Sequence, residues 1–398
     1  MAADKQDKVL NVPNLRFPEF TGEWKTSSVE DCLIRLENGA NYDANDIEGL
    51  PMSRIETIST SHIDYSKVGH SANLKNAEHY KMNYGDILFS HINSVRHIGK
   101  TAYYEAEKPL YHGMNLLLLR CGQEIDSKFF FYLLNNRHFL QRCQVLAKQA
   151  VNQASISISD LRKIGIYVPQ HDEQERIAKF LSIIDERITT QIRIIEDLKS
   201  LSDVICERLY NPSGKGVWQT YKYADLFSIS NERNGKFQYK NVLSASQEYG
   251  MIERNELNID IKFEESSITN YKIVRPNQYV IHLRSFQGGF AYSEKTGVCS
   301  PAYTILVPNE KLAMAFLKYY FTSKKFIDSL RIVTYGIRDG RSISVEEFLQ
   351  LKVTIPDISQ QNHIVRVMQL WEEKIRTEEA YLSRLQCQKM YLLSSMFV

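Results

Sequence analysis

The sequence contains one 56-residue element twice, at positions 187 residues apart. The first copy runs from Ser155 to Tyr210 and the second from Ser342 to Phe397, and the two align without a gap. Each copy opens with Ser-Ile-Ser, reaches a proline (Pro169 or Pro356), and then continues without proline or glycine. Internal duplication constrains a fold more strongly than any single motif, because both copies must satisfy the same packing. We therefore expect two related halves.

Apolar residues recur every three or four positions after each proline, which predicts an amphipathic helix with one apolar stripe. The first stripe comprises Ile177, Leu181, Ile184, Ile188, Ile192, Ile195, Leu198, Ile205 and Leu209. The second comprises Ile364, Met368, Trp371, Ile375, Leu382, Leu385, Leu392 and Met396, with Glu379 at the position of Ile192. About 38 residues give a helix of roughly 57 Å. We expect the two helices to pack on each other antiparallel around a pseudo-twofold axis. The alternative is that each packs only on its own half.

Length and composition bound the class of protein. A chain of 398 residues with 43% apolar residues can fill two or three domain cores. The net charge of +2 neither favours nor excludes nucleic acid. Six cysteines without a CxxC pair are typical of reduced thiols, and neither an apolar signal core nor a run of about 18 apolar residues occurs. These features predict a cytoplasmic protein without a membrane segment.

The order of segments predicts an α+β fold of two β-rich globular domains joined by two long antiparallel helices, a coiled-coil spacer. Domain 1–169 has strand candidates in MSRIETIS, GDILFSHI, GKTAYYEA and MNLLLLRC, followed by one helix in SKFFFYLLNNRHFLQRCQVLAKQ. The first spacer helix occupies 170–211. Domain 212–356 has strand candidates in FQYKNVLSAS, NQYVIHLRSF, GGFAYSEK and YTILVPN and a helix in AFLKYYFTSKKFIDSL. The second spacer helix occupies 357–398.

Catalytic and cofactor motifs are absent from the sequence. The segment from Ser94 to Thr101, SVRHIGKT, lacks the first glycine of a phosphate-binding loop and leads into a predicted strand. His91 and His97 have no cysteine or carboxylate cluster nearby, which disfavours a metal site. No GxSxG, HExxH, GxGxxG or methyltransferase signature is present. We expect no catalytic residue, no metal and no cofactor.

Taken together, these features resemble the specificity subunit of type I restriction–modification systems. The resemblance is carried by LRFPEF…W at 15–24, by EQERIAKFLSIIDERI after Pro169, by LKSL near the helix end, and by the second copy of the whole unit. It covers essentially the whole chain. The second copy departs from the pattern: Gln360 and Gln361 stand where an acidic residue and glutamine are usual, and Trp371-Glu372 replaces Ile184-Asp185.

The resemblance implies a bacterial, non-catalytic subunit with two target-recognition domains, each recognising half of a bipartite, asymmetric site in double-stranded DNA. It also implies that the paired helices set the spacer and dock two adenine methyltransferase subunits, with restriction/translocase subunits in the full complex. A coiled-coil scaffold that bridges two proteins without touching bases remains an alternative. A self-sufficient enzyme is disfavoured by the missing motifs.

Polar loops beside the predicted strand ends are the candidate DNA contacts, because Arg suits guanine, Asn and Gln suit adenine, and Lys suits phosphate. An ordinary solvated loop is the alternative for each single residue. The candidates are Asn93, Ser94, Arg96, His97 and Lys100 in the first domain, followed by Asn152 and Gln153, then Arg284, Ser285 and Gln287 in the second domain, followed by Arg338 and Arg341.

The most specific prediction from the sequence concerns Arg96 and Arg284 as DNA contacts. If either contacts a base, its change to Ala should cost about 1–3 kcal/mol of binding and relax one position of one half-site. If it contacts a phosphate, binding should weaken for all sequences, with a salt slope smaller by about one. Binding titrations over a set of duplexes distinguish the two outcomes, and no change in either property would remove both residues from the interface.

Overall fold

A computed structural model describes residues 11–43, 46–58, 62–94, 97–149, 154–212, 217–246, 249–254, 265–282, 289–330, 334–335 and 342–398. Two compact units result: unit 1 comprises residues 1–192 and 381–398, and unit 2 comprises residues 193–380. Each long helix therefore contributes one part to each unit. The expected four-part division into 1–169, 170–211, 212–356 and 357–398 stays a prediction.

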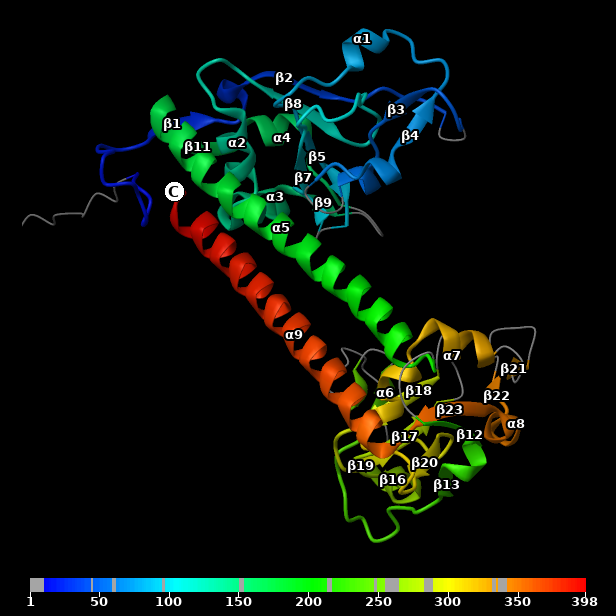
Figure 1. The fold of residues 1–398 in the computed structure, drawn as a ribbon. Helices are drawn as coiled ribbons and strands as arrows, with labels where there is room; N and C mark the ends of the chain where they lie inside the picture. The colour runs from blue at the N-terminus through cyan, green and yellow to red at the C-terminus, as the bar shows by residue number, and fades with distance from the viewer. Residues whose placement is uncertain are drawn as a thin grey trace, which may run out of the picture. The chain divides into compact units, whose positions relative to one another are not determined.

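The two long helices are confirmed as α5 (His171–Leu209) and α9 (Ile358–Ser395), each continuous in Figure 1. In the core of unit 1, Ile177 and Leu181 of α5 are buried together with Leu392 and Met396 from the end of α9. The core of unit 2 combines the start of α9 with the end of α5. Within each unit the helices thus pair antiparallel, and the alternative that each packs only on its own half is wrong.

A four-stranded antiparallel sheet forms the centre of each unit, with the same strand order in both. In unit 1 the order is β2 (Leu33–Asn38), β8 (Leu117–Cys121), β5 (Ile87–Phe89) and β7 (Thr101–Tyr103). In unit 2 it is β13 (Phe227–Ser230), β20 (Thr304–Pro308), β17 (Gln278–Ile281) and β18 (Phe290–Ser293). The expected duplication therefore extends to the sheet topology, although the sequences of the two sheets differ.

The strand of each repeat pairs with the strand that opens its unit. β11 (Gly165–Val168) lies antiparallel to β1 (Lys25–Ser28), and β23 (Lys352–Pro356) lies antiparallel to β12 (Trp218–Lys222). Smaller sheets pair β3 (Leu50–Met52) with β4 (Gly69–Ser71), β14 (Leu243–Ser246) with β15 (Gly250–Glu253), and β16 (Lys272–Val274) with β19 (Gly297–Cys299). The shorter helices outside the pair include α1 (Ala77–Tyr80), α4 (Ile158–Arg162) and α8 (Val345–Gln350).

Two local expectations are wrong. The strand expected in MSRIETIS is largely a 3-10 helix, Ile55–Ile58, because the Thr57 hydroxyl accepts a hydrogen bond from the Arg54 N–H and stabilises a turn. The single helix expected after residue 127 is two helices, α2 (Ser127–Leu134) and α3 (Arg137–Leu146). Asn136 causes the break, since its side chain caps the first turn of α3 by accepting from the Phe139 N–H.

The same break occurs in unit 2, between α6 (Phe316–Tyr320) and α7 (Lys324–Ser329). Ser323 stands 187 residues after Asn136 and accepts from the Phe326 N–H. The helix break is therefore part of the duplicated design.

A buried glutamine joins the start of each long helix to its sheet domain. In unit 1 the Gln174 Oε1 accepts from the Asp126 N–H at 2.9 Å, and its Nε2 donates to the carbonyls of Glu124 and Pro169. In unit 2 the Gln361 Oε1 accepts from the Ala313 N–H at 2.8 Å, and its Nε2 donates to the matching carbonyls of Lys311 and Pro356. Both side chains are almost fully buried, so only these partners can satisfy the main-chain groups.

Changing Gln361 to Ala should lower the free energy of unfolding by about 1–3 kcal/mol, because buried main-chain groups lose their partners. Gln369→Ala, at an exposed position of the same helix, is the matched control and should change stability by less than about 0.5 kcal/mol. Urea denaturation followed by circular dichroism measures both. Equal effects would show that the buried glutamine adds nothing specific.

Candidate nucleic-acid interface

The loop between β5 and β7 in unit 1, residues 90–100, carries five of the predicted DNA contacts. Main-chain hydrogen bonds close it: the Ser90 N–H donates to the Lys100 carbonyl at 2.8 Å, and the Gly99 N–H donates to the Ser90 carbonyl at 3.0 Å. Gly99 has a φ of 84°, and a Cβ there would lie 2.9 Å from the Leu140 side chain on α3. The loop is thus tied to the sheet and packed against α3, and the positive φ at position 99 favours glycine.

Polar side chains within this loop hold one another. The Asn93 Oδ1 accepts from the Ser94 N–H at 2.8 Å, and the Asn93 Nδ2 donates to the Ser90 hydroxyl at 3.3 Å. The Ser94 hydroxyl lies 2.8 Å from the His97 Nδ1. Ser94 and His97 are exposed, so this hydrogen-bonded pair stands at the surface. A side chain that is already ordered loses less entropy when it contacts a ligand.

A second polar segment lies directly beside this loop. β6 (Ile92–Asn93) pairs with β10 (Ala154–Ser155), which pairs in turn with β9 (Lys148–Gln149). The Ile156 N–H donates to the His91 carbonyl at 2.9 Å and extends this ladder. Residues 92–93 and 148–149, which belong to two polar segments that the sequence indicated separately, therefore lie in one small sheet. No sequence signal had suggested this pairing across about 60 positions.

Two buried histidines lie at the base of this region. Burial lowers the pKa of His91 to about 4, and burial likewise lowers the pKa of His112 to about 4. The His112 Nε2 is 3.0 Å from the Leu116 carbonyl, whereas the Nδ1 atoms of both rings have no hydrogen-bond partner among the described residues. Both rings are therefore neutral at pH 7.

The structure describes four of the twelve predicted contact residues: Asn93, Ser94, His97 and Lys100. The other eight, Arg96, Asn152, Gln153, Arg284, Ser285, Gln287, Arg338 and Arg341, lie outside the described residues. The placement of the four is compatible with a surface role, but their contact with DNA stays a prediction.

Unit 2 has hairpins at the matching positions. β17 and β18 correspond to β5 and β7 in the sheet order, and the His282 N–H donates to the Gly289 carbonyl where their connection leaves the sheet. β21 (Thr334–Tyr335) pairs with β22 (Ser342–Ile343), which places 336–341 in a second connection. Along the chain, the predicted contacts Arg284, Ser285, Gln287, Arg338 and Arg341 stand between the strands of these two pairs.

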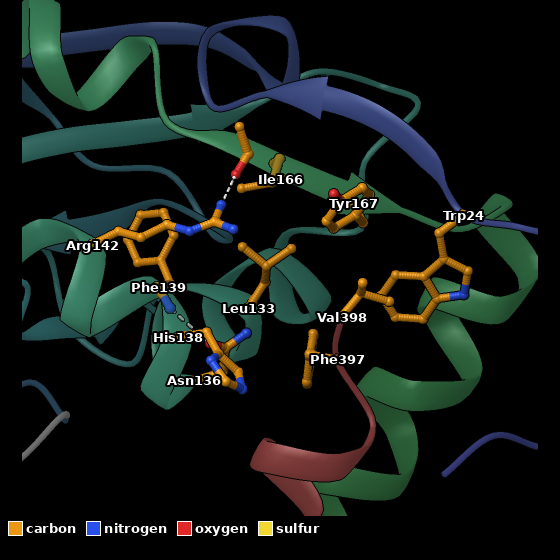
Figure 2. A pocket seen from close by; sticks show the side chains of 11 residues that line it. Trp24, Leu133, Asn136, His138, Phe139, Arg142, Ile166, Tyr167, Phe397 and Val398 are labelled. Atoms are coloured by element: carbon orange, nitrogen blue, oxygen red, sulfur yellow. Dashed lines mark hydrogen bonds between the residues drawn. The ribbon is translucent and has the colours of Figure 1, made fainter. Parts of the chain in front are cut away.

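A metal-binding cluster is not found in the part of the chain that the structure describes. No group of three or more His, Cys, Asp or Glu residues there could hold a metal ion. One cavity, shown in Figure 2, has a volume of about 20 Å³ and is lined by Trp24, Leu133, Phe139, Ile166, Phe397 and their neighbours. This is space for about one water molecule. None of the described helices has both the length and the hydropathy that a membrane span requires.

The fold places the chain in a class of duplicated α+β proteins whose two units share a sheet topology and two long helices. A family model of the type I restriction modification DNA specificity domain matches residues 22–200 and again 216–386. The chain therefore belongs to the family of type I restriction–modification specificity subunits.

Related proteins agree with this assignment. The MjaX specificity subunit of a type I restriction enzyme from Methanocaldococcus jannaschii is 38% identical over 234 residues, which are 56% of this chain and 54% of that protein. A type I specificity subunit from Mycoplasma genitalium is 34% identical over 89 residues, 22% of each chain. The chain thus matches about half or less of the length of these curated relatives.

Solved structures show the same fold. The S subunit of a type I system from M. genitalium has a TM-score of 0.56 at 17% identity, with 97% of this chain and 99% of that chain covered. A chain from a structural study of the assembly and conformational transition of the type I system has a TM-score of 0.58 at 13% identity, covering 93% and 96%. At these identities the likeness concerns the fold alone.

Acid should destabilise the protein through the buried histidines. The unfolded chain binds a proton on each imidazole near pH 6.5, whereas the folded chain does so only near pH 4. The stability they contribute is therefore complete above pH 6.5 and is lost as pH falls toward 4. Urea denaturation at pH 7 and pH 5 should show this loss.

The double variant His91→Gln/His112→Gln should show a smaller loss of stability between pH 7 and pH 5 than the wild type. The control His62→Gln, at an exposed position of unit 1, should keep the wild-type pH dependence. An unchanged pH dependence in the double variant would mean that other groups control the acid response.

Proposed function

We propose that this chain is the DNA-specificity subunit of a type I restriction–modification complex and that each unit recognises one half of a bipartite, asymmetric site in double-stranded DNA. The observation that carries the proposal is the pair of hairpin connections at matching positions of two units with one topology. A duplicated scaffold with unlike loops suits two half-sites of different sequence.

The contrast between scaffold and loops supports this division. The buried glutamines, the cap positions and the sheet order recur in both units. The loops do not: residues 90–100 are SHINSVRHIGK, whereas 282–289 are HLRSFQGG. Both loops offer donors that suit base edges and phosphates. Specificity can therefore differ between units that fold in the same way.

Outward apolar residues on the long helices are the proposed docking surfaces for two adenine methyltransferase subunits. Unit 1 exposes Ile183, Tyr381 and Tyr391, and unit 2 exposes their repeat counterparts Leu370, Ile194 and Val204. The exposed fractions of Tyr391 and Leu370 are 62% and 59%. Exposed apolar residues on a helix commonly mark a protein contact. Their repetition at the 187-residue interval favours two copies of one partner.

In this scheme the chain has no catalytic residue and no cofactor of its own. Methyl transfer belongs to the methyltransferase subunits, and cleavage and translocation to the restriction subunits. The helix pair sets the spacer between the half-sites, and the complex acts on DNA in the cytoplasm.

The alternative of a protein-bridging coiled-coil scaffold makes a different prediction. A scaffold leaves no footprint on DNA, whereas the proposed subunit protects two separated short tracts in a salt-dependent manner. The hairpin loop of unit 1, with its surface-exposed Ser94 and His97, favours the DNA-binding function.

Exchange of the first domain tests the proposal. The chain and its methyltransferase subunits should produce methylated adenines in a bipartite site, and the chain alone should methylate nothing. Replacing residues 24–153 by those of another specificity subunit should then change one half-site and leave the other intact, because unit 2 keeps its own loops. Methylome sequencing of cells carrying either version measures this.

A matched exchange of 218–340 should change the other half-site. Methylation by the chain alone, or a change of both half-sites on exchange of one domain, would contradict the proposal.

A further inference from the structure

One stretch of unit 1 contains no acidic residue. From Ser127 to Ser159 there are four basic residues, Lys128, Arg137, Arg142 and Lys148, and neither Asp nor Glu, although the chain holds 47 acidic residues in 398. The stretch comprises α2, α3 and the small sheet strands β9 and β10. A stretch with basic residues and no carboxylate of its own favours contact with polyanions.

Helix α3 turns a polar face of this stretch to solvent. Arg137, Gln141 and Gln144 are exposed and follow one another at helical spacing. Leu140, on the adjoining side of the helix, meets the candidate loop at Gly99. Lys148 is exposed on β9, within the same small sheet as Asn93. The polar face of α3 therefore adjoins the predicted base-contacting loop.

The basic residues of this stretch differ in their partners. The Lys128 ammonium is bound to Glu105 at 2.6 Å, so its charge is neutralised within unit 1. The Arg142 Nη1 donates a hydrogen bond to the Gly165 carbonyl, drawn as a dashed line in Figure 2. Among the described residues, Arg137 and Lys148 have no carboxylate within salt-bridge distance. Arg137 lies in the first turn of α3, where the helix dipole disfavours a cation. Helix stability therefore does not explain why an arginine occupies this position.

The second copy repeats the charge. Residues 314–344 contain six basic and two acidic residues, a net +4 that equals the charge of residues 127–157. Lys324 and Lys325 on α7 stand 187 residues after Arg137 and His138, and both are exposed. The loops diverge between the copies, but a positive charge at the start of this helix, on Arg137 or Lys324, is present in both. Because the proposed half-sites differ in sequence, a contact common to both units is expected to involve the phosphates rather than the bases.

We propose that Arg137, Gln141 and Gln144 of α3, together with Lys148, bind DNA phosphates beside the half-site, and that Lys324 and Lys325 do so in unit 2. This inference rests on the proposed function and adds to it a backbone-binding surface. Phosphate contacts fix the position of a protein on the duplex, so that the neighbouring loop meets the base edges.

Salt titration of binding tests this surface. The complex of the chain with its methyltransferase subunits is titrated with a duplex that carries the site found by methylome sequencing, between 50 and 200 mM salt. Arg137→Gln and Lys148→Gln should each reduce the slope of log K against log salt by about 0.9, and the double variant by about twice that. Gln144→Lys should steepen the slope by a similar amount and tighten binding at low salt.

Lys128→Gln is the matched control, because it removes a basic residue of the same stretch whose charge Glu105 already neutralises. Its slope should equal that of the wild type. Sequence preference should be unchanged in every variant. Slopes that equal the wild-type slope for Arg137→Gln, Lys148→Gln and Gln144→Lys would overturn the inference and leave the proposed function intact.

Two further outcomes would also overturn the inference. If Arg137→Gln altered the sequence preference of DNA binding at one base position, Arg137 would be a base contact. Loss of methyltransferase subunits from the complex, measured by size-exclusion chromatography, would make the face a protein interface. Absence of any specific, salt-dependent binding by the wild-type complex would instead contradict the proposed function itself.

Discussion

The burial of each long helix in two different cores is the constraint on which the structure depends. Helix α9 starts in the core of unit 2, and its end lies in unit 1, where the Phe397 ring is 5.4 Å from Phe129. The end of α5 lies in unit 2, where the Tyr210 ring is 5.0 Å from Phe316. Neither core is complete without a segment from the other repeat. Each repeat by itself thus lacks part of its core, so we expect the two halves to fold together.

Departures from the duplication follow from local partners. Glu173 is buried and binds Arg16 of the N-terminal arm, with Nε–Oε1 and Nη2–Oε2 distances of 2.8 and 2.7 Å, and it also accepts from the Trp24 indole. The second repeat follows no such arm, so a buried carboxylate there would lack this cation, and Gln360 takes the position. Gln360 in the second copy thus follows from the absence of a segment like the one that contains Arg16.

A second departure shows compensation between helices. In unit 1 the Tyr132 hydroxyl donates to Asp185, whose other oxygen is 2.5 Å from Lys389. In unit 2 the Tyr319 hydroxyl donates to Glu372, but the lysine comes from the neighbouring position 318 on α6, because the counterpart of Lys389 is a serine. The hydrogen bond from tyrosine to carboxylate is kept, and the source of the positive charge has changed. The Trp371-Glu372 replacement therefore preserves the contact that Ile184-Asp185 makes.

The sequence predicted the long helices well because a stripe of apolar residues over 38 positions has few other solutions. It failed where a single side chain decides the backbone, as Asn136 does by ending one helix and capping the next. For the candidate site, composition indicated which loops are polar, but the pairing of Asn93 with Ala154 is a contact between distant segments without a periodic signal. The sequence also could not indicate that α3 adjoins the loop, since that depends on the packing of Leu140 against Gly99.

The way the unit 1 loop is held explains how specificity can vary on a fixed scaffold. Its closure depends on main-chain groups of Ser90, Gly99 and Lys100 and on the buried side chain of Ile98. Substitution of exposed residues such as Ser94 or His97 leaves these main-chain bonds in place. Such substitutions should therefore change the free energy of folding only slightly. The polar face of α3, which we propose to bind phosphates, would add affinity that does not depend on those residues. Under the proposed function, new loop side chains can then alter the base preference before binding is lost.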